Sequence, residues 1–215
     1  DFRCKGIGSQ LFNYGTNILS KLNPNTIWVF FRSDLGESAK FYSNRGANSW
    51  YSYHYMIYSG NPVFKETYCF DKVEPYENRH FDVYLENRAA AFLPVNKLID
   101  ARPHDERERK DEILNWTVSN KKNIWLFWKN EKLAGSITLY DGLFDELFVS
   151  PEFRGKGYGK DIVHWALKKV TEESHKPSLC VVTKNIPAIN LYESLGFEVA
   201  QTLELMRIFS PDKKP

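Results

Sequence analysis

Residues 149–160 read VSPEFRGKGYGK, a strand exit followed by a glycine-rich turn that leads directly into a helix. Gly155, Gly157 and Gly159 lack a Cβ atom, so consecutive backbone N–H groups of the turn can point into one concavity. Such a concavity lies at a helix N-terminus, where unpaired donors and the helix dipole favour an anion. The stretch therefore predicts a site for a phosphate group, and a pyrophosphate suits it best.

The spacing of this turn excludes two common phosphate loops. A Walker loop requires Gly-x-x-x-x-Gly-Lys followed by Ser or Thr, which Arg154 and Asp161 do not allow. A dinucleotide fingerprint requires Gly-x-Gly-x-x-Gly, whereas the spacing here is Gly-x-Gly-x-Gly. On this motif alone, a plain strand-to-helix turn with glycines at tight corners stays open as an alternative.

A second motif lies about 25 residues further on. Residues 182–198 read VTKNIPAINLYESLGFE. Together with Arg154-x-x-Gly157-x-Gly159, this pattern resembles the two signatures of the GNAT acetyltransferase superfamily. The resemblance covers residues 66–210. It implies an α/β fold (α+β with a mixed sheet), the GNAT acyl-CoA N-acyltransferase fold, which binds an acyl-coenzyme A.

The resemblance also implies which residues bind the cofactor. The backbone of the glycine turn would hold the coenzyme A pyrophosphate, and the strand before it would pair with the pantetheine arm as an added strand would. Asn185 would contact that arm, although Asn is also a common helix N-cap. The expected cofactor-binding residues are Leu147, Phe148, Val149, Arg154, Gly155, Lys156, Gly157, Tyr158, Gly159, Lys160 and Asn185.

Tyr192 is the expected catalytic acid. It follows Asn185 by seven residues, so the two lie on nearly the same face of a helix. In the family a tyrosine at this place donates a proton to the departing coenzyme A thiolate. The alternative is an aromatic core residue, because Leu191, Leu195 and Phe197 surround it in the sequence.

Asp145 and Glu146 are the candidates for the general base that an amine nucleophile requires. Neighbouring residues of a strand face opposite sides, so at most one of the two is expected to line the cleft. A carboxylate held among apolar residues has a raised pKa, which suits a base. Alternation groups Glu146 with Phe144 and Phe148, and Glu146 is favoured.

The N-terminus repeats the second half of this pattern. With an offset of 151, Phe2 and Gly6 fall on Phe153 and Gly157, and the apolar run 28–31 falls on 179–182. We therefore expect a duplication, with residues 1–65 a partial half-domain of helix-strand-helix-strand and residues 66–215 a complete domain. The N-terminal half of the first copy is expected to be absent from residues 1–65.

The first copy departs from the pattern at three positions: Cys4, Asp34 and Ala47 replace Gly155, Asn185 and Phe197, while Tyr42 still matches Tyr192. An acidic Asp34 near a pantetheine arm would be unfavourable. A scaffold or acceptor-site role is thus favoured over a second active site.

Further elements are expected around these motifs. Residues 66–150 predict a strand at 67–73, helices at 79–95 and 104–118, and three strands at 123–129, 132–140 and 143–149. The charged run 103–112 is expected to form a solvated helix face. The aromatic run 50–58 is expected to be a buried strand, with stacking on a ligand as the alternative.

Composition limits the partners. A net charge of +2 gives no electrostatic reason to expect nucleic acid or an anionic membrane. Three widely spaced cysteines suit reduced thiols in the cytoplasm, and Cys180 is expected in the core. The five histidines show no metal-ligand spacing, and no apolar run approaches the roughly 20 residues that span a bilayer.

The resemblance to the GNAT superfamily implies an N-acetyltransferase that moves an acetyl group from acetyl-CoA to a primary amine by direct attack. The acceptor would be a small-molecule or peptide amine, no metal would be involved, and a homodimer is possible. The alternatives are a non-catalytic acyl-CoA sensor or interaction module on the same fold, and transfer of a different acyl group.

Overall fold

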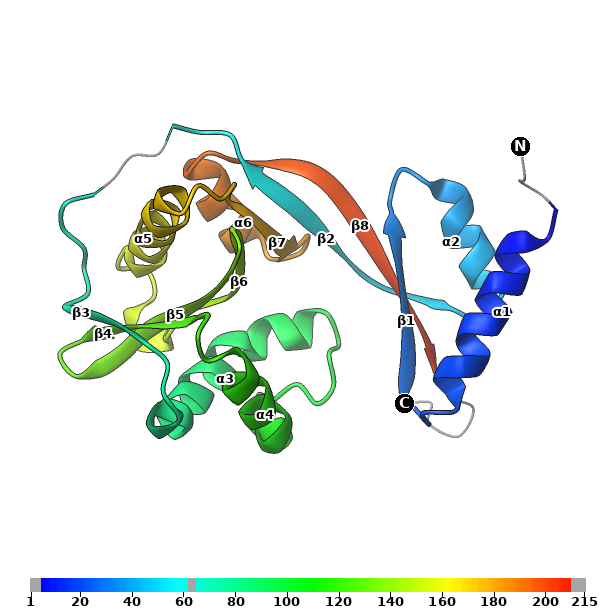
Figure 1. Cartoon of the computed structure of the whole chain (residues 1–215), viewed down its shortest axis with the longest axis horizontal. Coiled ribbons are helices and arrows are strands. Elements are labelled where there is room, and N and C mark those ends of the chain that lie inside the picture. Colours follow the sequence, from blue (N-terminus) through cyan, green and yellow to red (C-terminus); the bar gives the residue numbers. More distant parts are fainter. Residues whose placement is uncertain (1–4, 62–64, 210–215) are drawn as a thin grey trace. The chain divides into compact units, whose positions relative to one another are not determined.

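The computed structural model describes residues 5–61 and 65–209. The described chain forms two compact units (Figure 1). The larger unit consists of Tyr53–Gln201, and the smaller unit consists of Asp1–Ser52 with Thr202–Pro215. Strands β2 (Asn48–Tyr58) and β8 (Phe197–Phe209) each contribute residues to both units.

The larger unit is built on a mixed sheet in the strand order β3-β4-β5-β6-β7-β2-β8. Neighbouring strands from β3 to β6 are antiparallel, β6 and β7 are parallel, and β2 is antiparallel to β7. The remaining strands are β3 (Lys72–Pro75), β4 (Ile124–Lys129), β5 (Lys132–Tyr140), β6 (Leu143–Val149) and β7 (Ser178–Val182).

Helices cover both faces of this sheet (Figure 1). Helix α5 (Tyr158–Glu172) lies on one face, and α3 (Phe81–Leu98) and α4 (Lys110–Asn120) lie on the other. Helix α6 (Ile186–Ser194) follows β7. Three short 3₁₀ turns connect the elements: Asn78–His80, Glu106–Arg109 and Pro151–Phe153.

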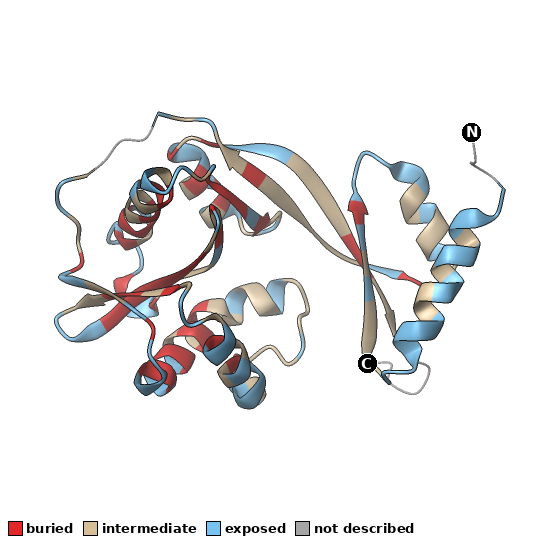
Figure 2. Ribbon diagram, viewed as in Figure 1, coloured by how far each residue is buried: buried red, intermediate tan, exposed pale blue. Residues whose placement is uncertain are grey.

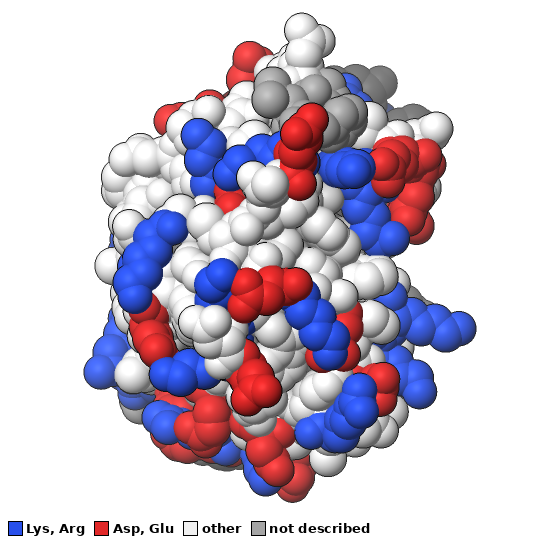
Figure 3. Space-filling view, turned by 90° about the vertical axis from the view of Figure 1, so that its left-hand side faces the viewer, with Lys and Arg blue, Asp and Glu red and all other residues white. Residues whose placement is uncertain are grey.

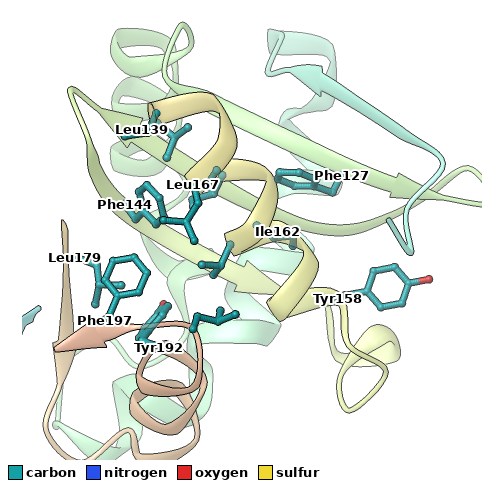
Figure 4. Close-up of a cluster of buried hydrophobic side chains, with 14 of the residues drawn as sticks. Phe127, Leu139, Phe144, Tyr158, Ile162, Leu167, Leu179, Tyr192 and Phe197 are labelled. Carbon is teal, nitrogen blue, oxygen red and sulfur yellow. The ribbon is translucent and has the colours of Figure 1, made fainter. Parts of the chain in front are cut away.

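Helix α5 is amphipathic, and its apolar stripe fixes it on the sheet. Ile162, Val163 and Ala166 are completely buried in the core that α5 shares with β5, β6 and β7 (Figures 2 and 4). A Cβ atom at Gly135 of β5 would lie 2.7 Å from Ile162 Cδ1 and 2.5 Å from the Phe148 carbonyl oxygen. Only glycine therefore allows this close approach of helix and strand.

The smaller unit contains α1 (Ile7–Ser20), β1 (Thr26–Arg32), α2 (Gly36–Ser43) and parts of β2 and β8. Its core is small and consists of Phe31, Ala47 and Met206, with Tyr42 stacked on Phe31 at 5.5 Å. The element order α1-β1-α2-β2 is that of α5-β7-α6-β8, as expected for residues 1–65. The duplication itself stays a prediction.

The two helices that the repeat aligns differ in burial (Figure 2). Tyr158 and Ile162 of α5 are buried, whereas Ile7 and Leu11, which align with them, are 42% and 66% exposed. Helix α5 packs on β5 and β6, and the described part of the smaller unit contains no strands that correspond to these. Cys4, like Phe2, lies outside the described residues.

The pairing of β1, β2, β7 and β8 is reciprocal. Strand β2 pairs with β7, with Tyr53 opposite Val182 and Ile57 opposite Ser178. Strand β1 pairs with β8, with Thr26 opposite Phe209. The repeat aligns β1 with β7 and β2 with β8. The N-terminal segment therefore supplies β2 as the partner of β7, and the C-terminal segment supplies β8 as the partner of β1. The compact units therefore divide the chain differently from a sequence boundary at residue 65.

Most expected elements are found within a few residues of their predicted bounds, and β5 and β6 match them. The strand expected at 67–73 is displaced, because β3 covers only Lys72–Pro75. The preceding residues are held instead by the N-terminal turn of α5, where Cys69 N donates to Asp161 Oδ2 at 2.7 Å. Lys65 Nζ forms an ion pair with the same carboxylate.

Candidate active site

A cavity of about 640 Å³ lies where β6 ends and α5 begins. We call it the loop cavity, because the glycine turn forms one of its walls. The end of β6, helix α3 and the start of α6 form the others. It is lined by Ala91, Phe92, Pro94, Val95, Leu147, Phe148, Val149, Phe153, Arg154, Gly155, Gly157, Tyr158, Gly159, Lys160, Asn185, Pro187, Ala188 and Leu191.

The glycine turn adopts a backbone that other residues rarely accept. Gly155 has φ 71° and Gly157 has φ 87°, both in the left-handed region. Gly157 is the N-cap of α5, so the free N–H groups of the first helical turn follow it directly. The turn and the helix N-terminus therefore form a concavity of the kind that binds anions.

The basic side chains of the turn differ in their placement. The Arg154 guanidinium is held by two carbonyl groups, since Nη2 donates to Ala91 O at 2.7 Å and Nε to Val149 O at 3.3 Å. Lys160 lines the loop cavity. Lys156 does not line it, and its Nζ donates to Glu152 O at 2.8 Å. Of the expected cofactor-binding residues, only Lys156 is outside this lining.

Strands β6 and β7 separate next to the cavity. They pair only at Leu143 with Ser178 and at Phe144 with Leu179. The rest of β6 keeps its pairing with β5, where Val149 lies opposite Gly135. The separation leaves a wedge along Leu147–Val149 in which an extended ligand can lie beside a strand edge.

A second cavity of about 280 Å³ adjoins the loop cavity. We call it the carboxylate cavity, because Asp145, Glu146 and Glu106 line it together with Arg88, Tyr192 and Cys180. The two cavities share the lining residues Phe92, Val95, Leu147, Asn185, Ala188 and Leu191.

Both Asp145 and Glu146 line this cavity, so the expectation that only one of them would do so is wrong. The reason is a β-bulge, in which β6 has one more residue than β5 between the pairs Ser136–Phe148 and Thr138–Asp145. Glu146 takes φ 50° there. The extra residue breaks the alternation of side chains that the sequence argument assumed.

Arg88 of α3 holds Glu146 in place. Its guanidinium forms an ion pair with Glu146 and contacts Glu106 through Nε at 2.7 Å and Nη2 at 3.2 Å. Arg88 and Glu106 are only 5% and 4% exposed. The expectation of a solvated face for residues 103–112 is therefore wrong for Glu106, which turns inward to meet a buried cation. The sequence analysis did not find Arg88, since a single arginine within a helix gives no signal.

Asp145 has no ion pair with a basic group among the described side chains, in contrast to Glu146. Its Oδ1 accepts from Glu146 N at 2.9 Å. The Asp145 side chain is exposed, but protein atoms crowd its carboxyl group in the cavity wall; this desolvation, followed by the neighbouring Glu146, raises the pKa of Asp145 above its ordinary value. A carboxyl group of this kind can take up a proton more readily than an aspartate surrounded by water.

Tyr192 combines the two alternatives that the sequence left open. Its ring is buried in the core beside Phe197, at 5.9 Å between centroids (Figure 4). The residue also lines the carboxylate cavity. Burial and then Asp145 raise the pKa of Tyr192 to about 12, so the phenol keeps its proton at neutral pH.

Two further expectations concern Cys180 and Asn185. Cys180 is exposed and lines the carboxylate cavity, so its expected place in the core is wrong. Its neighbours Leu179 and Val181 face the core instead, because β7 alternates. Asn185 occupies the N-cap position of α6 without a capping hydrogen bond from its side chain, and it lines both cavities.

The sequence profile of the Acetyltransferase (GNAT) family matches residues 74–197, which include both cavities. The chain belongs to this family. Peptidyl-lysine N-acetyltransferase YiaC of Escherichia coli is 32% identical over 84 residues, which are 38% of this chain and 53% of that protein. The match thus spans about half the length of this relative.

Two solved structures show the same family fold. A GCN5-related N-acetyltransferase from Sphaerobacter thermophilus aligns over 97% of this chain and 69% of that chain, with a TM-score of 0.72 and 17% identity. The PaiA N-acetyltransferase from Thermoplasma acidophilum, solved with coenzyme A, aligns over 65% of this chain and 98% of that chain. Its TM-score is 0.51 at 18% identity.

Charge and hydropathy add little to this picture. On the face shown in Figure 3, Lys and Arg side chains alternate with Asp and Glu, and neither sign dominates. Within the described residues, no group of three potential metal ligands occurs and no helix is long and apolar enough to cross a bilayer.

Proposed function

We propose that this GNAT family member is an N-acetyltransferase that moves the acetyl group of acetyl-CoA to a primary amine in a ternary complex. The observation that carries the proposal is the junction of the two cavities. One has an anion-binding turn and a strand wedge, and the other has a free carboxyl group and a buried phenol. A thioester at the junction would meet both sets of groups.

The loop cavity suits acetyl-CoA. In this proposal the N–H groups of the glycine turn bind the pyrophosphate, and Lys160 adds positive charge. The pantetheine arm lies along Leu147–Val149, where β6 has separated from β7, and contacts Asn185. Arg154 acts by fixing the start of the turn against α3 through its hydrogen bond to Ala91.

In the proposed reaction the amine nitrogen attacks the thioester carbonyl, a C–N bond forms and the C–S bond breaks. Asp145 takes the proton that the amine loses, directly or through water. Tyr192 donates its proton to the leaving thiolate. We propose Asp145 over Glu146, which the sequence favoured, because the Glu146 carboxylate is already paired with the Arg88 guanidinium, whereas Asp145 has no basic partner among the described side chains.

Substitution of Tyr192 tests the catalytic part of the proposal. We expect Tyr192→Phe to lower kcat by about 10²-fold, the usual range for loss of an acid, with the KM for acetyl-CoA unchanged. The measurement is steady-state kinetics on a panel of amines. Tyr42→Phe is the matched control, because Tyr42 aligns with Tyr192 but lies in the small core of the smaller unit.

Calorimetric titration with acetyl-CoA separates the remaining possibilities. Binding with turnover supports the enzyme, and binding without turnover on any amine would favour the acyl-CoA sensor. Absence of both heat and thermal shift would contradict both functions. Turnover undiminished in Tyr192→Phe would refute the acid assignment alone.

A further inference from the structure

One face of strand β2 continues the wall of the carboxylate cavity. Cys180 and Val182 of β7 line that cavity. Tyr55 lies directly opposite Cys180, and Tyr53 lies directly opposite Val182. Residues that are directly opposite in an antiparallel pair share a face of the sheet. The two tyrosines therefore stand on the cavity side of β2, next to its lining.

The other face of β2 confirms this orientation. Met56 lies opposite Leu179, and both are buried in the core on the α5 side. Tyr55 directly precedes Met56, and Tyr53 lies two residues before Tyr55. Because side chains alternate along a strand, both tyrosines point away from the core that Met56 enters. Both are partly exposed, which leaves aromatic surface for a ligand. Partial burial and then Cys180 raise the pKa of Tyr53, as expected for a phenol close to that cysteine.

The row extends across three strands. The last paired residues of β6 and β7 are Phe144 and Leu179. The residues that follow them, Asp145 and Cys180, both line the carboxylate cavity. Desolvation and then the Asp145 charge raise the pKa of Cys180, so the two groups lie close together. Asp145, Cys180 and Tyr55 thus follow one another from β6 through β7 to β2. The free carboxyl group lies at one end of the row and aromatic rings lie at the other.

The charge of the cavity favours a cation. Three carboxyl groups, Glu106, Asp145 and Glu146, face it with a single guanidinium, Arg88. Aromatic faces also attract cations, and the attraction increases when water is displaced. A neutral or anionic acceptor would gain from neither feature.

We propose that Tyr53 and Tyr55 form the outer wall of the acceptor site and select a cationic alkylamine, a flexible aliphatic chain with an ammonium group. This inference rests on the proposed function. The aliphatic chain lies along the tyrosine rings, and the ammonium group reaches Asp145. The ammonium group loses one proton to solvent water before attack, and Asp145 takes the second proton as the C–N bond forms. Residues outside the two sequence motifs, and N-terminal to the family match at 74–197, thus determine specificity.

The test uses the full chain with three probes: a lysine-containing peptide, 1,4-diaminobutane and aniline, which is neutral at pH 7.5. In Tyr53→Ala and Tyr55→Ala we expect the KM for an alkylamine to rise about three- to tenfold for each ring. The KM for acetyl-CoA and the KM for aniline should stay within twofold. Tyr53→Phe and Tyr55→Phe keep the aromatic face and should remain close to the wild type.

Tyr14→Ala is the matched control, because Tyr14 is an exposed tyrosine of α1 in the smaller unit. If the wild type acetylates alkylamines and both alanine variants keep its KM values, the wall is refuted and the proposed function stands. An equal loss on aniline and alkylamines would also refute selection of a cation. If the wild type acetylates no probe although it binds acetyl-CoA, the failure lies with the proposed function.

The peptide and the diamine distinguish a protein side chain from a free polyamine as the source of the amine.

Discussion

Asp145 and Glu146 are neighbours in the chain but have different surroundings. Glu146 is neutralised by Arg88, whereas Asp145 accepts only a backbone hydrogen bond from Glu146 and faces the cavity. Two causes raise the pKa of Asp145: first the desolvation of its carboxyl group by the cavity wall, and then the adjacent charge of Glu146. This difference separates a carboxylate that supports the site from one that can exchange a proton.

We expect kcat/KM to rise with pH through the pKa of Asp145, since the base must be ionised. Asp145→Asn should remove this rise and lower the rate by about 10²-fold.

The same pKa affects stability. A folded-state pKa above the unfolded value stabilises the fold below the unfolded pKa. This contribution is lost as the pH rises through the folded pKa. Asp145→Asn should therefore raise Tm at neutral pH. Asp141→Asn, in an exposed turn, is the control. A variant with normal activity and unchanged Tm would contradict the assignment.

At the scale of elements, Arg88 connects helix α3 with the bulged strand β6 and the turn Glu106–Arg109. Burial raises the pKa of Glu106, although Arg88 opposes this effect. The ion pairs therefore do more to position these elements than to add stability, because desolvation offsets much of their attraction.

Arg88→Met should nevertheless lower the free energy of unfolding by about 3–5 kcal/mol, because it leaves the buried Glu106 with only the more distant Arg109, whose Nη2 lies 3.7 Å away. Urea denaturation measures the change. Arg107→Met is the matched control. Arg107 also pairs with two carboxylates, Asp105 and Glu86, but at an exposed position, so its loss should lower the free energy of unfolding far less. Equal losses in the two variants would show that burial of Arg88 has no special role.

The turn between β6 and α5 is an element whose geometry requires glycine. Gly157→Ala places a Cβ atom at φ 87°, which costs about 1–2 kcal/mol, so we expect the turn to relax and its N–H groups to rotate. Calorimetry should then show weaker binding of acetyl-CoA, by about tenfold. Gly36→Ala is the control, because Gly36 begins α2 in open space without a positive φ. Unchanged affinity in Gly157→Ala would remove the turn from the cofactor site.

At the scale of the whole molecule, the larger unit depends on residues that precede the family match. Tyr53–Ile57 of β2 pair with β7, and Met56 is completely buried in the core of that unit. A chain that starts at residue 66 has all the motifs but lacks this strand.

We expect the fragment 66–215 to show a lower Tm than the full chain and to aggregate, because the edge of β7 is open and the core around Leu179 is exposed. Differential scanning fluorimetry and light scattering measure both effects. A peptide of residues 48–58 added in excess should restore Tm by strand addition, and a scrambled peptide should not. A fragment as stable as the full chain would refute this dependence.

The order of elements and the motifs of the site followed from the sequence. Glycine spacing at 155–159 and the apolar periodicity of α5 are local properties, so they could be predicted without contacts. The proposed cofactor-binding residues lie together for the same reason, since short motifs at strand and helix ends carry their own geometry.

The acceptor side was decided by the tertiary structure. Three features of that side depend on which segments meet in space: the bulge at Glu146, the burial of Glu106 beside Arg88 and the exposure of Cys180. Pairing of β2 with β7 joins residues more than 120 positions apart, and no local pattern encodes it. Periodicity reports the two faces of an element, whereas long-range packing determines what each face meets.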